Sequence, residues 1–164
     1  MLSHEPTPLY ANMNLKVGSY NIQGQNRKNE IKLRKIKTLY NKGKFDILLL
    51  QETRSDGTDK ELKKWQKVFN TKNVFLSDFG TNSVGAGIVI RQNDSFKVHQ
   101  HFIDPGGRYV AIIGDHEESS FLILSLYSPS VSHKLSSSLR SLVSNYQNWG
   151  QNYQNLLLLE GILT

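Results

Sequence analysis

Residues 46–53 read DILLLQET, and this stretch decides the fold. Four consecutive apolar residues are typical of a strand that is buried on both faces, so helices or a second sheet must cover it. The run ends abruptly in Gln-Glu-Thr, which places the Glu52 carboxylate at the end of a buried strand. Mg²⁺ takes one or two such carboxylates together with waters and phosphate oxygens, so Glu52 is a candidate metal ligand. The alternative is that Glu52 is simply the first solvated residue after the strand.

Segments of changing hydrophobic periodicity lie on both sides of this strand. Strands are predicted at 15–22, 74–77, 87–91, 96–102, 109–114, 121–127 and 156–159, and helices at 27–44, 60–69 and 132–149. Polar or Gly-containing turns separate the four strands between 74 and 114, as in an antiparallel meander. The order β-α-β-α, a run of strands, then α-β predicts a layered α/β (α+β) domain.

Length and composition favour one globular domain. The chain has 164 residues, of which 38% are hydrophobic and 21% charged. Residues 1–13 carry little pattern and are expected to form a flexible leader, with the domain at 14–164. We find neither a secretory signal nor an apolar run long enough for a membrane helix, so we expect an intracellular protein, nuclear or cytoplasmic, without a membrane partner. The absence of cysteine excludes disulfides, thiolate metal sites and cysteine nucleophiles.

The charge of the chain points weakly to nucleic acid. The net charge is +6 and the pI is about 9.5, and a basic surface attracts polyanions. Basic residues crowd the predicted helix at 27–44, where Arg27 and Lys28 could contact phosphates; Arg54 is a third candidate. The alternative is a solvated helix face.

Two further strand ends carry polar side chains. Asn21 closes the first strand and could orient a substrate or a carboxylate, although Asn followed by Gly24 is also an ordinary turn. Tyr127 ends the strand before Pro129 and could donate a hydrogen bond to a phosphate. The alternative for Tyr127 is an aromatic ring packed at a sheet edge.

Three other motifs are interpreted as structural. His99 and His101 share one face of a strand with no carboxylate nearby, so we interpret them as surface residues. Residues 115–118 read DHEE and are most simply a polar hairpin turn. Residues 85–87 read GAG but lack the Lys and the helix of a phosphate-binding loop.

Taken together, five stretches resemble the endonuclease/exonuclease/phosphatase superfamily, and most closely the apurinic-endonuclease-like domains of LINE-type retrotransposons. The matching stretches are SYNIQG (19–24), DILLLQET (46–53), GAGIVI (85–90), GRYVAI (107–112) and ILSLYSPS (123–130). The resemblance implies a four-layer α/β sandwich. This chain would hold its N-terminal portion, with the first mixed sheet and its helices present and the second sheet largely missing.

The resemblance also implies roles for single residues. Asn21 matches the active-site Asn of the family, Glu52 its metal-binding Glu, and Tyr127 its phosphate-contacting Tyr. The implied reaction is Mg²⁺-assisted hydrolysis of a DNA phosphodiester, the nicking of target DNA for retrotransposition. DNA is the implied partner and Mg²⁺ the implied cofactor.

The resemblance fails near the C-terminus. The family has Gly-Asp-Phe-Asn after an apolar strand, whereas here Gly161 takes the Asp position and Leu163 the Asn position. Glu160 is one place off, which on a strand is the opposite face. No Asp follows Asp115, so the terminal Asp-His pair of the family is also missing.

We therefore expect a truncated domain without catalysis of its own. An incomplete second sheet would leave an apolar face open, which a partner chain or the missing C-terminal part would have to cover. The alternative function is a non-catalytic nucleic-acid-binding module or a decayed retroelement remnant.

Overall fold

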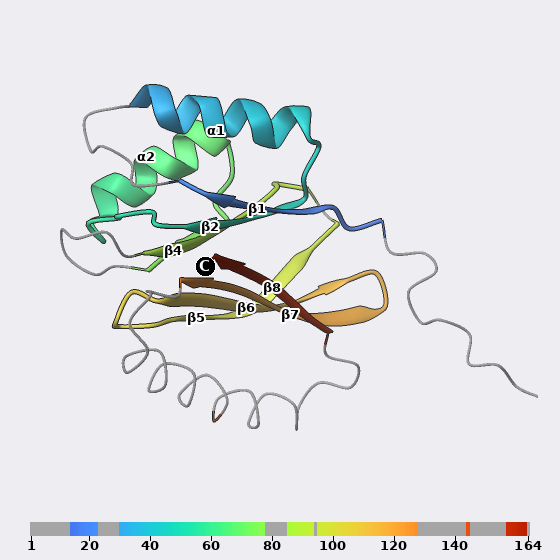
Figure 1. Ribbon diagram of the computed structural model, residues 1–164. Helices are drawn as coiled ribbons and strands as arrows, with labels where there is room; N and C mark the ends of the chain where they lie inside the picture. The colour runs from blue at the N-terminus through green and yellow to red at the C-terminus, as the bar shows by residue number, and fades with distance from the viewer. Residues whose placement is uncertain are drawn as a thin grey trace, which may run out of the picture.

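The computed structural model describes residues 14–22, 30–77, 85–93, 95–127, 144 and 157–163. Within these ranges the chain forms three layers, which are a pair of helices, a four-stranded sheet A and a four-stranded sheet B (Figure 1). The strand order is β1-β2-β4-β3 in sheet A and β5-β6-β7-β8 in sheet B. The layered α/β class predicted from the sequence is thus confirmed.

The predicted elements that fall on described residues are all found, with boundaries shifted by a few residues. The helices are α1 (Glu30–Lys42) and α2 (Asp59–Phe69). The strands are β1 (Val17–Asn21), β2 (Ile47–Gln51), β3 (Val74–Leu76), β4 (Ala86–Ile90), β5 (Lys97–Ile103), β6 (Tyr109–His116), β7 (Ser119–Tyr127) and β8 (Leu157–Leu163).

Strand β2 lies inside sheet A and is buried along its whole length. It pairs in parallel with β1 and antiparallel with β4. Leu48 and Leu50 join the core between sheet A and the helices, whereas Ile47 and Leu49 join the core between the two sheets. This burial on both faces explains the unbroken apolar run, because each fully buried leucine or isoleucine side chain contributes about 1.5–3 kcal/mol.

The second sheet is more complete than predicted. We expected it to be largely missing, but four of its strands are present. Side chains from β6 and β7 pack against β2 and β4 in the core between the sheets, among them Ile112 and Ile123. Sheet A therefore does not leave the broad open face that the expected truncation implied.

The predicted meander between 74 and 114 is also corrected. Strands β3 and β4 pair in sheet A, while β5 and β6 pair in sheet B. The chain crosses between the sheets after Arg91, whose Nε donates to the Phe45 carbonyl at 2.8 Å. Phe96 then enters the core between the sheets. Alternating hydrophobicity predicts strands but does not say which sheet each one joins, so the division could not be inferred.

Some expectations concern parts of the chain that the structure does not describe. The leader at 1–13 and, apart from residue 144, the helix at 132–149 lie outside the described residues. Among the helices that the structure does describe, none has the length and apolar character needed to cross a membrane.

Helix α2 begins at a well-formed cap. The Thr58 side chain accepts a hydrogen bond from the Glu61 backbone amide at 3.2 Å, and the Glu61 carboxylate accepts from the Asp56 amide in the preceding loop. The helix buries Trp65 and Phe69, whose rings stack with centroids 5.8 Å apart. This cap fixes the path of the chain between the end of β2 and the helix.

Replacing Thr58 with alanine is expected to destabilise the protein by about 1 kcal/mol, because one amide of the first turn loses its acceptor. Chemical denaturation of both proteins measures the difference. Thr38→Ala is the matched control, since Thr38 lies in the middle of α1 on its exposed face and its hydroxyl donates to the Arg34 carbonyl. Alanine there should be neutral or slightly stabilising. Equal losses in the two variants would contradict a capping role.

Candidate functional site

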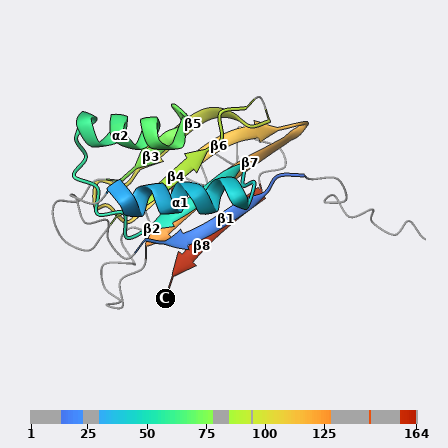
Figure 2. The same cartoon turned by 90° about the horizontal axis from the view of Figure 1, so that it is seen from above.

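The carboxyl ends of four strands meet at one end of the molecule, which we call the rim. Strands β1 and β2 run parallel with Asn21 opposite Gln51, and β7 and β8 run parallel with Tyr127 opposite Leu163. The Ser125 hydroxyl of β7 donates to the Leu50 carbonyl of β2 at 2.8 Å, which joins the two pairs near these ends. Two perpendicular views show the arrowheads of β1, β2 and β8 at this end (Figures 1 and 2).

Asn21 and Glu52 are in direct contact at the rim. The Asn21 side-chain amide Nδ2 donates to Glu52 Oε1 at 3.1 Å. Both side chains are partly exposed, so a solvent-borne ligand can reach them. The structure thus brings together two residues that lie 31 positions apart in the sequence.

An unusual backbone conformation directs the Glu52 carboxylate toward Asn21. Leu48 and Leu50 face the helices, so a Glu52 in extended conformation would face them too. Instead Glu52 has a φ of 54°, in the left-handed region that non-glycine residues rarely adopt. The next amide, Thr53 N–H, donates to the Gly85 carbonyl at 3.1 Å and holds the turn against sheet A. Such a conformation costs about 1–3 kcal/mol and persists only where the surroundings impose it.

A buried polar cluster supports the rim from below. Gln51 is fully buried, and its side-chain amide donates to Ser19 Oγ at 3.2 Å and to Ser125 Oγ at 3.5 Å. It therefore links β1, β2 and β7 one residue before Glu52. No role was predicted for these three residues. The signal that could have found them is a glutamine at an inward-facing position of an otherwise apolar strand, because a buried polar group needs partners.

Tyr127 lies at the same rim on the opposite sheet. It is partly exposed, and its amide donates to the Arg108 carbonyl at 2.7 Å. Alternation along β7 puts Tyr127 on the face that carries Ser125, which is the face toward sheet A. Tyr127 is therefore positioned to face a ligand held near Glu52.

Of the three predicted nucleic-acid contacts, the structure describes only Arg54. Arg54 follows Glu52 by two positions and is half-buried, with a left-handed φ of 47°. Its Nε is buried and makes no hydrogen bond among the residues described. Arg27 and Lys28 lie outside the described residues.

The donors at the rim are compatible with Mg²⁺ but do not form a complete cage. Among the described residues no group of three or more His, Cys, Asp or Glu side chains could hold a metal ion. Mg²⁺ commonly uses one or two carboxylates and completes its octahedron with waters and substrate phosphates. Glu52, steadied by Asn21, offers one such carboxylate.

Strand β8 brings the departures from the family pattern to the rim. Its register pairs Gly161 with Ser125 and Leu163 with Tyr127. The predicted strand at 156–159 thus continues through both positions at which the resemblance would place Asp and Asn. Glycine and leucine carry no side-chain donor or acceptor for a phosphate or a water.

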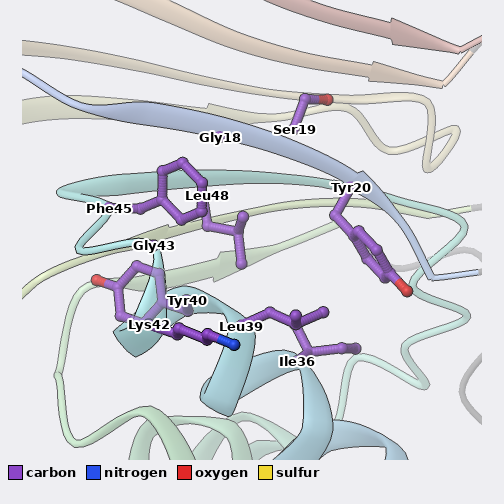
Figure 3. Close-up of a pocket in the computed structure, with 10 residues that line it drawn as sticks. All are labelled: Gly18, Ser19, Tyr20, Ile36, Leu39, Tyr40, Lys42, Gly43, Phe45 and Leu48. Carbon is purple, nitrogen blue, oxygen red and sulfur yellow. The ribbon is translucent and has the colours of Figure 1, made fainter.

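An apolar pocket at β1 is separate from the pair of Asn21 and Glu52. It has a volume of about 520 Å³ and lies between β1 and α1 (Figure 3). Phe45 and Leu48 line its base, and Tyr20 and Leu39 are its exposed apolar residues. Neither Asn21 nor Glu52 lines it, and its one charged lining residue is Lys42, so it offers no carboxylate to a metal ion.

The histidines of β5 require one correction. His99 was expected to have no carboxylate nearby, but its Nε2 lies 2.5 Å from Asp115 Oδ2 on β6. The Asp115 pKa is lowered, because hydrogen bonds from His99 and Ser120 outweigh the opposing effect of burial. The predicted hairpin turn at 115–118 is present as the tight turn at Glu117 and Glu118. The pair lies at the β6–β7 turn, away from the rim.

Comparison with known proteins gives similarity in structure only. No protein-family model matches the chain, and no curated protein matches its sequence. Among solved structures, TDP2 from Caenorhabditis elegans superposes with a TM-score of 0.64 at 17% identity, over 90% of this chain and 46% of that one. D. rerio TDP2, complexed with a single-strand DNA product, gives 0.61 at 14% identity, over 90% of this chain and 59% of that one. An endonuclease/exonuclease/phosphatase family protein from Bacteroides thetaiotaomicron gives 0.58 at 15% identity, over 89% and 62%. The chain spans less than two thirds of each of these three structures and shares their fold.

Proposed function

We propose that this chain, which has the endonuclease/exonuclease/phosphatase fold, carries the metal- and phosphate-binding part of a Mg²⁺-dependent DNA phosphodiesterase site. The observation that carries the proposal is the hydrogen bond from Asn21 to Glu52 at 3.1 Å. It holds a carboxylate at the end of a buried strand, where a hard cation could bind both this carboxylate and a phosphate oxygen.

Each rim residue has a part in this proposal. Glu52 would hold the cation, which would polarise the phosphate and stabilise the leaving oxygen. Asn21 orients the Glu52 carboxylate, and Tyr127 donates its phenolic hydrogen to a phosphate oxygen from the facing sheet. Gln51 keeps the two sheets in register beneath them.

DNA is the proposed substrate for three reasons. The motifs around Asn21, Glu52 and Tyr127 resemble LINE-type endonucleases, whose reaction is the nicking of target DNA. The net charge of +6 favours a polyanion. One solved structure with this fold is TDP2 in complex with a DNA product.

A second candidate is a DNA-binding module that does not cut. Gly161 and Leu163, at the end of β8, favour it, because neither has a side-chain group that could position a water or a phosphate. On this view the metal site anchors a phosphate without hydrolysing its ester. The two candidates make the same prediction for metal-dependent binding and opposite predictions for nicking.

The sign of the Mg²⁺ effect on DNA affinity tests the shared part of both. Mg²⁺ normally weakens binding through lysines, since it competes for the phosphates. A cation bridging Glu52 and a phosphate should instead strengthen it. We expect Mg²⁺ to tighten the binding of a fluorescent DNA duplex at constant ionic strength, and EDTA to reverse the gain.

Plasmid nicking then separates the two candidates. The second candidate predicts that the chain binds supercoiled plasmid with Mg²⁺ without nicking it, because Gly161 and Leu163 replace the implied Asp and Asn. Mg²⁺-dependent nicks would establish the phosphodiesterase itself. Weaker DNA binding in Mg²⁺ for the unaltered chain would contradict a metal site at the rim.

A further inference from the structure

A cationic groove separates the two helices on the outer face of sheet A. Helices α1 and α2 lie side by side over the sheet in both views (Figures 1 and 2). The groove has a volume of about 440 Å³ and is lined by one carboxylate, one apolar residue and six cationic side chains. We call this cleft the lysine groove, and its cationic residues are Arg34, Lys37, Lys60, Lys63, Lys64 and Lys67.

Most of the positive charge in this groove has no ion-pair partner among the described residues. Its one carboxylate, Glu30, is already paired with Arg34 at 2.6 Å. Among the residues that the structure describes, no carboxylate lies within ion-pair distance of the five groove lysines. A cleft walled by one sign of charge concentrates counterions, so it selects an anionic ligand.

The spacing of the lysines on α2 places like charges next to one another. Lys60, Lys63, Lys64 and Lys67 are separated by three or four positions, so they share one helix face. Like charges at this spacing each cost a few tenths of a kcal/mol. A bound polyanion would remove this repulsion. Anion binding therefore accounts for the clustered lysines, whereas packing does not.

The groove leads away from the rim. Helix α1 follows the end of β1 and α2 follows the end of β2, so both helices begin on the side of the rim. Glu30 and Lys60, from the first turns of the two helices, both line the groove. At 1.5 Å per residue, Lys60 to Lys67 span about 10 Å, the length of about three nucleotides at the spacing of a duplex strand.

We propose that the lysine groove binds the sugar-phosphate backbone of the DNA strand that passes the rim. This rests on the proposed function for the identity of the polyanion, but it needs neither metal nor catalysis. The lysines contact phosphates and read no base, so binding is independent of sequence and steep in its salt dependence.

Two triple variants of the full chain test this proposal. Lys60→Gln/Lys64→Gln/Lys67→Gln removes three charges from the groove. Lys35→Gln/Lys42→Gln/Lys72→Gln removes three charges outside it, so both variants have the same net charge. The measurement is fluorescence anisotropy of a labelled 20-nucleotide single strand across a salt series, with EDTA present throughout.

The groove variant should flatten the slope of log K against log salt by about 2. Each lost contact with a single strand removes about 0.7 from that slope, and three contacts are lost. The control variant should keep the slope of the unaltered chain. The groove variant should also melt at the same or a higher temperature, since repulsion on α2 is relieved. A merely structural role of these lysines would lower the melting temperature instead.

The outcomes separate this inference from the proposed function. Because EDTA excludes divalent metal, failure of the Mg²⁺ effect leaves the groove result intact, and the reverse also holds. Equal slope changes in the two variants would overturn the proposal that the groove binds DNA, because net charge alone would then explain the salt dependence. Groove-dependent binding of poly-glutamate without groove-dependent binding of DNA would also overturn it, and would assign the groove to an acidic protein.

Discussion

Glu52→Gln is expected to weaken Mn²⁺ binding by this chain at least about tenfold. Loss of a residue that only supports a metal ligand already lowers metal affinity by about tenfold or more, and Glu52 is proposed as a direct ligand. Glutamine keeps the shape of the side chain, and its carbonyl oxygen can still accept from Asn21 Nδ2. It removes the charge, which is the larger part of the attraction between a carboxylate and a hard cation. The fold should therefore persist while the affinity falls.

Titration calorimetry with Mn²⁺ measures the affinity, and thermal denaturation verifies the fold. Glu118→Gln is the matched control, since Glu118 is exposed in the β6–β7 turn and the change of charge is identical. In the DNA experiment, Mg²⁺ should tighten binding by the control and weaken binding by Glu52→Gln. Equal Mn²⁺ affinities in the two variants would remove Glu52 from the metal site.

Gly85→Ala is expected to destabilise the protein by about 3 kcal/mol, from backbone strain and overpacking together. Gly85 has a φ of 129°, a conformation that side chains rarely allow. An added Cβ would lie 2.4 Å from Thr53 Oγ1, and Thr53 is fully buried. Relief of that contact moves the turn that directs Glu52, so Mn²⁺ affinity should fall as well.

A double-mutant cycle isolates the collision from the strain. Thr53→Ala removes the hydroxyl that the added Cβ would meet. The double variant should therefore be destabilised by less than the sum of the two single variants, and the difference should be about 1 kcal/mol or more. Thr53→Ser keeps the hydroxyl and should show little such coupling. Urea denaturation of the five variants supplies the free energies. The same coupling for alanine and serine would contradict a specific contact between Gly85 and Thr53.

The candidate site was predictable where the chemistry lies at strand ends. Asn21 and Glu52 were identified because each is a polar residue at the end of a predicted strand. The resemblance of their motifs to one family then implied that both belong to one site. Their contact is now explicit at 3.1 Å, but their roles in metal and phosphate binding stay predictions. Tyr127 was placed at the same rim, and its role too awaits a test.

The supporting residues were not predictable in the same way. Gln51, Ser19 and Ser125 lie on three strands, and each is an unremarkable polar residue in its own segment. Their common function depends on β7 lying across from β2, which is a contact between sheets. The contact between His99 and Asp115 was missed for a different reason, because β5 and β6 pair across a bulge between Val98 and Gln100 that no periodicity reveals.

The sequence by itself determined the elements and their order. Hydrophobic period separates helix from strand, and an unbroken apolar run requires cover on both faces, so DILLLQET implied an inner strand with layers above and below. Only the tertiary structure decided which strands share a sheet, how far the second sheet extends, and where the Glu52 carboxylate points. Those three outcomes depend on pairing between distant segments and on a left-handed residue held by Gly85, and local pattern carries no information about either.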